Sequence, residues 1–133
     1  MAKILILEDE APVMEFLKSI ITGMGHEVVG SNNGRDGLEL VRITKADVIV
    51  SDLHMPEEPN GMALIRMVRA LQPQCPIVIV SGYPTTEVMA EAEQLGITDF
   101  LTKPFEIPFV RSVLSRMLAN KSAAPSRPST SPK

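Results

Sequence analysis

The chain has little cysteine, few aromatic residues and no long hydrophobic run, and each of these shortages excludes a class of protein. Cys75 is the single cysteine, so the chain can form neither an internal disulfide nor a thiolate metal site. No apolar run approaches the roughly 20 residues of a membrane span. A net charge of -3 offers no electrostatic footprint for nucleic acid or anionic lipid. We therefore expect a cytoplasmic protein with no direct nucleic-acid or membrane partner.

The length and composition predict one globular domain followed by a tail. The chain has 133 residues, of which 44% are hydrophobic and 22% charged, which is enough for one ordinary core. After Asn120 the sequence becomes rich in Pro, Ser and Ala and has no large apolar side chain to bury. We expect a domain over residues 1–120 and a disordered tail or linker over residues 121–133.

Short apolar runs alternate with longer helix-compatible stretches along the domain. The runs lie at Ile4–Leu7, Val28–Val29, Val48–Val50, Ile77–Val80 and Phe100–Leu101. The helices predicted after them span about Ala11–Met24, Gly34–Ile43, Asn60–Leu71, Thr85–Leu95 and Glu106–Ala119. Strands that are continuously apolar are buried on both faces, as in parallel sheets covered by helices. The pattern predicts an α/β fold, a three-layer doubly wound sandwich with a five-stranded parallel sheet.

The predicted helices differ in how much apolar surface they offer to the core. The first presents Val13, Phe16, Leu17, Ile20, Ile21 and Met24, and the scattered methionines, such as Met14, Met24, Met67 and Met117, read as core residues. The fifth presents a full stripe of Ile107, Val110, Val113, Leu114, Met117 and Leu118. The fourth has only Val88, Met89, Ala92 and Leu95. We expect the fourth helix to pack most weakly and to be able to shift.

Three carboxylates stand at the ends of two predicted strands. Glu8 and Asp9 follow the first strand, and Asp52 ends the third. The carboxyl ends of parallel strands face one crevice, so these acids are expected to converge. Their mutual repulsion calls for cations, and a divalent metal together with Lys103 would supply them.

Oxygen ligands of this kind suit magnesium, which also keeps several waters. Asp9, Asp52 and the backbone carbonyl of His54 could supply them. A carboxylate so placed can attack phosphorus to form an acyl phosphate. Lys103 would then neutralise one phosphoryl oxygen, and the hydroxyl of Ser81, at the end of the fourth strand, would donate to another.

The order of motifs resembles the receiver domain of two-component response regulators, over residues 3 to about 119. The matching segments are Ile4–Glu10, Asp52–Pro56 with Asn60–Gly61, Val80–Gly82 and Phe100–Phe105. Each motif is weak evidence by itself, but four in the right order are highly specific. The resemblance implies a flavodoxin-like receiver fold with strand order 2-1-3-4-5.

The resemblance also implies roles for individual residues. Asp52 looks like the phospho-acceptor, Glu8 and Asp9 like the acidic pair that holds Mg²⁺ or Mn²⁺, Ser81 like the switch hydroxyl, Phe100 like the switch aromatic and Lys103 like the family's lysine, followed by a cis bond to Pro104. The implied phosphoryl donor is a sensor histidine kinase or histidine phosphotransfer protein. The implied output is a downstream protein bound by the face of the fourth helix, fifth strand and fifth helix. A start at Met1, just before the first strand, suggests an N-terminal or stand-alone receiver.

The sequence departs from the usual receiver pattern in a few places. The loop between Pro56 and Asn60 has one extra residue, Glu8 replaces the commoner Asp, and Gly82 stands where Ala is usual. None of these changes removes a reacting group. His54 and Tyr83 occupy positions that in receivers modulate the lifetime of the phosphoryl group.

Other interpretations of the same residues stay open. The acidic run Glu8–Glu10, taken alone, is typical of a helix N-terminus, and Phe100 could be an ordinary core aromatic. A magnesium-dependent aspartyl-phosphate phosphatase would need a second carboxylate two residues after Asp52, where this chain has His54. A flavodoxin-type cofactor carrier would need a phosphate-binding loop after the first strand. A pseudo-receiver scaffold that is never phosphorylated is a further alternative.

Overall fold

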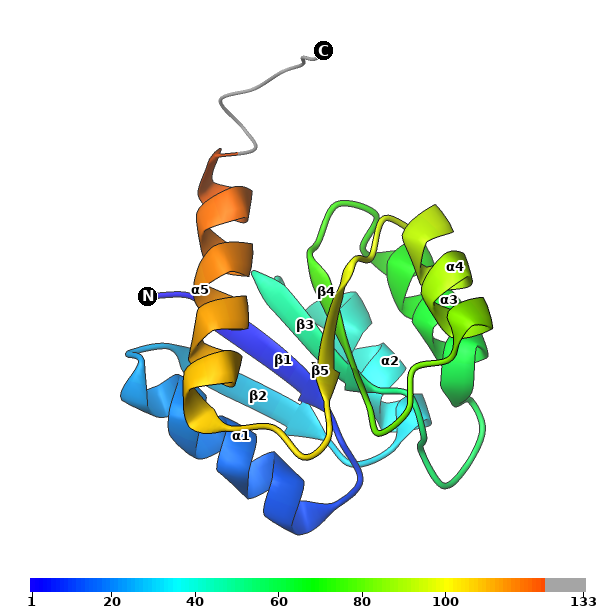
Figure 1. The fold of residues 1–133 in the computed structure, drawn as a ribbon, viewed down its shortest axis with the longest axis horizontal. Helices are drawn as coiled ribbons and strands as arrows, with labels where there is room; N and C mark the ends of the chain where they lie inside the picture. The colour runs from blue at the N-terminus through cyan, green and yellow to red at the C-terminus, as the bar shows by residue number, and fades with distance from the viewer. Residues whose placement is uncertain (124–133) are drawn as a thin grey trace.

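The computed structural model describes residues 1–123, in which five strands and five helices alternate along the chain (Figure 1). The strands are β1 (Lys3–Leu7), β2 (Glu27–Ser31), β3 (Val48–Asp52), β4 (Ile77–Ser81) and β5 (Asp99–Thr102). The helices are α1 (Ala11–Gly23), α2 (Gly34–Ile43), α3 (Gly61–Leu71), α4 (Thr86–Gln94) and α5 (Ile107–Ala123). Every strand contains its predicted apolar run, and every predicted helix is present.

The five strands form one parallel sheet in the order β2-β1-β3-β4-β5, which confirms the expected fold class. Helices α1 and α5 cover one face of the sheet, and α2, α3 and α4 cover the other (Figure 1). The chain leaves β1 toward β2 on one side and then returns to β3 on the other side. Such a reversal of strand order opens a crevice at the carboxyl ends of the strands, where ligands of this fold class bind.

The central strands are buried on both faces because their side chains are almost continuously apolar. All five residues of β3 and all five of β4 are buried, and so are the last four of β1. Alternate residues of each strand enter opposite cores: Ile4 and Ile6 pack toward α1 and α5, while Leu5 and Leu7 pack toward α2, α3 and α4. The sheet is therefore packed between two cores, which hold the carboxyl ends of its strands in fixed positions relative to one another.

Local signals in the sequence set where several helices begin and end. The Asn33 side chain accepts a hydrogen bond from the backbone N–H of Asp36 at 2.8 Å, and the Thr85 side chain accepts one from Val88 N–H at 3.1 Å. Both are N-cap contacts that satisfy otherwise unpaired donors of the first turn. Gly96 follows α4 with a φ of 77°, a left-handed conformation that glycine adopts at little cost.

Some predicted details of helix packing are wrong. Met67 is 46% exposed and Ile107 47% exposed, so neither belongs to the core. Phe16, expected on the buried face of α1, is half-exposed, and its ring stacks on that of Phe105 with centroids 6.0 Å apart. Helix α4 buries only Ala92, in agreement with its thin apolar stripe, but Met89, expected to point inward, is 43% exposed.

The predicted tail lies mostly outside the described residues. Helix α5 continues to Ala123, four residues beyond its predicted end at Ala119. Nothing in the structure bears on residues 124–133. Among residues 1–123, no helix combines the length and apolar composition that a membrane-spanning segment needs.

The loop between β3 and α3, which carries the extra residue, is packed against the start of α2. The Glu58–Pro59 bond in this loop is cis. A Cβ atom at Gly34 would lie 2.1 Å from the carbonyl oxygen of Pro59, so only glycine allows this approach. The Asn60 side chain donates to the Met55 carbonyl at 3.0 Å, which closes the loop back on its own beginning.

Candidate functional site

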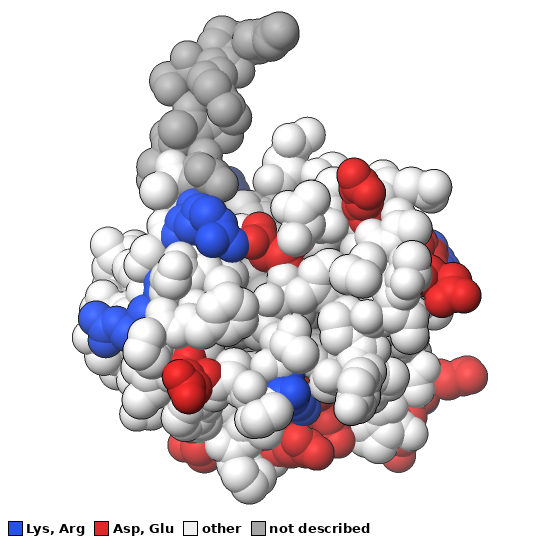
Figure 2. Space-filling view, viewed as in Figure 1, with Lys and Arg blue, Asp and Glu red and all other residues white. Residues whose placement is uncertain are grey.

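The predicted site residues gather at the carboxyl ends of the strands. Glu8 and Asp9 follow β1, Asp52 is the last residue of β3, Ser81 is the last of β4, and Lys103 follows β5. The outer rim of the molecule in this region carries several acidic side chains with a basic group among them (Figure 2). The sheet therefore brings together residues that are up to 95 positions apart in the sequence, as its topology requires.

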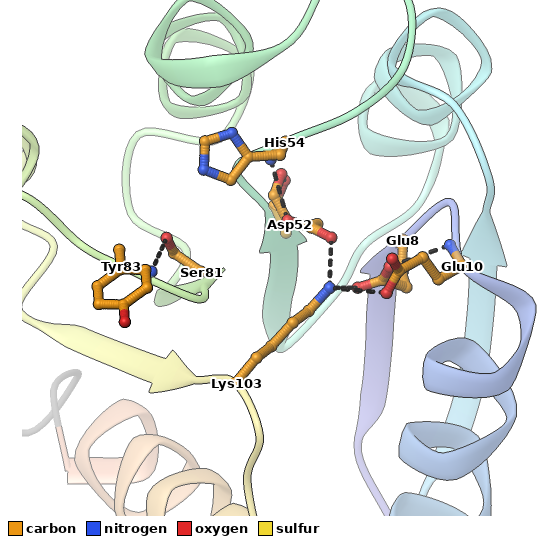
Figure 3. Close-up of polar contacts among 8 residues, drawn as sticks. Glu8, Glu10, Asp52, His54, Ser81, Tyr83 and Lys103 are labelled. Carbon is orange, nitrogen blue, oxygen red and sulfur yellow. Dashed lines mark hydrogen bonds and ion pairs between the residues drawn. The ribbon is translucent and has the colours of Figure 1, made fainter.

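Asp52 is a buried carboxylate held by a contact on each oxygen. It is 3% exposed. Its Oδ1 accepts a hydrogen bond from the backbone N–H of His54 at 2.9 Å, and its Oδ2 accepts one from Nζ of Lys103 at 3.0 Å (Figure 3). These contacts fix the orientation of the carboxylate, and the hydrogen bond from Lys103 also compensates its charge.

Glu8, Asp9 and Asp52 form a cluster suited to a cation. One carboxylate oxygen from each lies within 4.8 Å of the others. Oε2 of Glu8 accepts a hydrogen bond from the backbone N–H of Glu10 at 3.0 Å, but its Oε1 is buried and has no hydrogen-bond partner within the described part of the chain. The contact of Oε1 is an ion pair with Nζ of Lys103 at 3.5 Å. A buried carboxylate oxygen without a hydrogen bond is costly, so this atom fits a metal ligand.

The charges of this cluster shift the pKa values of two groups. Burial raises the pKa of Glu8 to about 7, and the neighbouring charge of Asp52 adds to the increase, against the backbone N–H of Glu10 and the charge of Lys103. Burial alone would lower the pKa of Lys103. The hydrogen bond and charge of Asp52, aided by Glu8 and Glu10, outweigh burial and raise the pKa of Lys103 above its ordinary value. Lys103 therefore stays an ammonium ion.

Glu10 was not singled out from the sequence, although it also contacts Lys103. Its Oε1 lies 3.2 Å from Nζ of Lys103, and its side chain is 59% exposed (Figure 3). The signal that could have identified it is its place in the acidic run Glu8–Glu10, directly after the strand end that faces Lys103. If the run is interpreted only as acids at a helix N-terminus, the contact of Glu10 with Lys103 is not predicted.

Ser81 and Phe100 occupy the neighbouring strands. The Ser81 hydroxyl is buried and accepts a hydrogen bond from the backbone N–H of Tyr83 at 3.2 Å, while the side chain of Tyr83 is exposed (Figure 3). Phe100 is half-buried and packs against the core shared by α2, α3 and α4. The Lys103–Pro104 bond is cis, as the resemblance implied. The roles of Ser81 and Phe100 in a switch, and of the His54 carbonyl as a metal ligand, stay predictions.

Known proteins share both the sequence pattern and this architecture. Over 116 residues the chain is 34% identical to the chemotaxis protein CheY of Thermotoga maritima. The aligned region covers 86% of this chain and 96% of CheY. It is 32% identical over 117 residues to the transcriptional regulatory protein ZraR of Escherichia coli K12, 88% of this chain but only 26% of ZraR. The chain thus spans about a quarter of the length of ZraR.

Solved structures and a family profile lead to the same group. The chemotaxis protein CheY4 of Vibrio cholerae superposes with a TM-score of 0.81 at 28% identity, covering 89% of this chain and 99% of that one. The profile of the response regulator receiver domain matches residues 4–115. With the parallel sheet and the acidic rim already described, this chain belongs to the receiver domains of response regulators, a family of signalling modules.

Proposed function

We propose that Asp52 accepts a phosphoryl group and that the charge it gains switches a protein-binding surface of this receiver domain. The observation that carries the proposal is the environment of the Asp52 carboxylate. It is buried at a strand end, one oxygen lies 3.0 Å from the Lys103 ammonium, and two further carboxylates lie beside it. The carboxylates would hold a cation, the cation and Lys103 would together balance the charge of a phosphoryl group, and the strand end would orient the Asp52 carboxylate toward phosphorus.

The transfer step exchanges one bond to phosphorus for another. An oxygen of Asp52 forms the new bond to phosphorus while the bond from phosphorus to the donor breaks, and the leaving group departs with the electron pair. The product is an aspartyl phosphate. Lys103 neutralises charge on a phosphoryl oxygen, and the Ser81 hydroxyl, released from the Tyr83 N–H or keeping it, can donate to another oxygen.

The cluster of carboxylates fits the divalent cation that the family uses. Glu8, Asp9 and Asp52 would hold Mg²⁺ or Mn²⁺, with the His54 carbonyl as a further oxygen ligand. The observation that supports this assignment is Oε1 of Glu8, which is buried and accepts no hydrogen bond within the described residues. When bound, the ion supplies positive charge that screens the incoming anion. The chain's own residues orient the nucleophile and hold the lysine in place.

The switch would act through α4, which is the least anchored helix. Ala92 is its one buried residue, and Met89 is 43% exposed. Movement of Ser81 toward the phosphoryl group, followed by Phe100, would change the surface formed by α4, β5 and α5, where a downstream protein would bind. Slower amide exchange in α4 after addition of beryllofluoride, a phosphoryl analogue, would support this route.

We propose a sensor histidine kinase or a histidine phosphotransfer protein as the phosphoryl donor, in the cytoplasm, with no turnover of other substrates. A phosphatase related by mechanism would need an acid at position 54. His54 stands there instead, and the contact it offers to Asp52 is a backbone N–H. A pseudo-receiver would lack one of the reacting groups, whereas Asp52, Lys103 and Ser81 are all in place.

Intact-mass spectrometry tests the proposed chemistry. The chain and Asp52→Asn are incubated with acetyl phosphate and magnesium, and a parallel sample contains EDTA. We expect one phosphoryl adduct on the wild-type chain and none on Asp52→Asn or with EDTA. Equal labelling of the variant would place the acceptor elsewhere. No labelling of the wild-type chain, when a known receiver is labelled in parallel, would favour the scaffold alternative.

A further inference from the structure

Lys103 binds a third carboxylate that belongs neither to the nucleophile nor to the metal-type cluster. Its ammonium lies 3.0 Å from Asp52 Oδ2, 3.2 Å from Glu10 Oε1 and 3.5 Å from Glu8 Oε1 (Figure 3). A lysine ammonium has three N–H donors. Two of these donors are hydrogen-bonded to Asp52 and Glu10, and Glu8 completes the ring of carboxylates as an ion pair without a hydrogen bond. An incoming phosphoryl oxygen therefore meets an ammonium already surrounded by carboxylates.

A phosphoryl group that arrives at Asp52 competes with these three carboxylates for Lys103. Asp52 carries that group and Glu8 is 1% exposed, so neither can turn out to water. Glu10 can, because its side chain is 59% exposed. Ion pairs of exposed side chains contribute little to stability, so exchanging this contact for water costs the least of the three.

The backbone of Glu10 places its carboxylate for this contact. The Glu10 N–H donates to Oε2 of Glu8 at 3.0 Å, which ties residue 10 to the acidic cluster. Glu10 is also the N-cap residue of α1, yet its side chain makes no capping hydrogen bond there. A carboxylate in this position would ordinarily accept from the first turn of its own helix. In this chain it reaches across to Lys103 instead.

We infer that Glu10 is a positioning residue that holds Lys103 in the resting site and competes with the phosphoryl group for it, an inference that rests on the proposed function of Asp52. Glu10 thereby slows phosphoryl uptake. The arriving phosphoryl oxygen takes the place of the Glu10 carboxylate on Lys103, and Glu10 turns to solvent. The same competition lowers the affinity of the site for any phosphoryl analogue.

Two substitutions separate the contact from the charge. Glu10→Gln removes the charge and weakens the ion pair. Glu10→Asp keeps the charge but shortens the side chain and favours capping of α1, so it also breaks the contact. Glu57→Gln, at an exposed loop acid with no ion pair to Lys103 in the described residues, is the control for a general loss of negative charge.

The measurement is the initial rate of labelling by acetyl phosphate over a range of donor concentrations at saturating magnesium, with beryllofluoride affinity as a second readout. We expect kcat/KM to rise about two- to fivefold in both Glu10 variants, which is the factor that the loss of an exposed ion pair supports. The rise should come from a lower KM and not from a higher kcat. Beryllofluoride should bind more tightly by a similar factor. Glu57→Gln should be labelled at the wild-type rate, and the melting temperature of Glu10→Gln should stay at its wild-type value.

Other results would overturn the inference in distinguishable ways. Wild-type rates in Glu10→Gln, with labelling still dependent on Asp52, would show that Glu10 does not hold Lys103 while the proposed function stands. A rise in Glu10→Gln but not in Glu10→Asp would assign the effect to charge at the rim and not to the contact. Labelling that does not need Asp52, or no labelling beside a labelled receiver control, would contradict the proposed function and this inference together.

Discussion

The ammonium of Lys103 lies 3.0 Å from Oδ2 of Asp52, across 51 positions of sequence. Asp52 is the last residue of β3 and Lys103 directly follows β5, and β4 lies between these two strands. Lys103 reaches over the end of β4, and its backbone N–H donates to the Ser81 carbonyl at 2.9 Å. The site is therefore assembled by the sheet, and each strand end contributes a different chemical group to it.

Replacing Lys103 by Met should destabilise the metal-free protein. The substitution leaves the buried carboxylates of Asp52 and Glu8 without their shared cation, a loss of about 2–4 kcal/mol for a largely buried pair. Urea unfolding in EDTA measures the change, with Lys45→Met at an exposed position as the control. Magnesium should recover part of the loss. A Lys103→Met variant as stable as Lys45→Met would mean that the carboxylates do not depend on Lys103.

Replacing Glu8 by Gln should stabilise the metal-free protein at high pH. The pKa of Glu8 is about 7 in the folded state against an ordinary 4.5, so between these values the folded chain holds a proton that the unfolded chain has released. Wild-type stability should fall as pH rises from 4.5 through 7. Glu8→Gln escapes this loss and should be more stable by about 1–3 kcal/mol at pH 8, and no more stable at pH 4.

Unfolding curves at pH 4, 6 and 8 in EDTA follow this dependence. Glu15→Gln, an exposed acid on α1, serves as the control and should show no such pH-dependent gain. A Glu8→Gln variant that is less stable than wild type at pH 8 would contradict the assigned environment of Glu8. Addition of magnesium at pH 8 should stabilise the wild-type chain more than Glu8→Gln, because the variant has lost a charged ligand.

Gly34 and Gly82 should respond differently to the same substitution. Gly34→Ala places a Cβ atom 2.1 Å from the Pro59 carbonyl oxygen, so the loop after β3 must move. We expect a loss of about 1–3 kcal/mol in the free energy of unfolding. A Cβ atom at Gly82 would meet nothing within 4 Å, so Gly82→Ala should be neutral or slightly stabilising. Thermal unfolding compares the two, and equal melting temperatures would argue against the close packing of this loop on α2.

Much of the fold and of the site could be predicted because the determining signals are local. Continuous apolar runs mark buried parallel strands, and the residue that ends each run must lie at the same edge of the sheet. Asp52, Lys103 and the acidic pair after β1 were found in this way. The fold class then followed from the number of runs and the helix-compatible stretches between them.

The missed features depend on contacts that periodicity does not encode. The ion pair of Glu10 with Lys103 is set by how far β5 and its following loop bring the lysine across the rim. The approach of Pro59 to Gly34 joins a loop to a helix start 25 residues away. Met67 and Ile107 have the right spacing for core positions, but no element of the described chain covers them. Apolar spacing predicts a face, and the neighbouring elements decide whether it is buried.

Mapping the phosphoryl group to one residue tests the central claim most directly. After labelling with acetyl phosphate and magnesium, borohydride reduction converts an aspartyl phosphate to homoserine, which peptide mass spectrometry locates in the sequence. We expect homoserine at position 52 alone, in the wild-type chain and not in an EDTA sample. Homoserine at Asp9 or another aspartate, with Asp52 unchanged, would contradict this prediction.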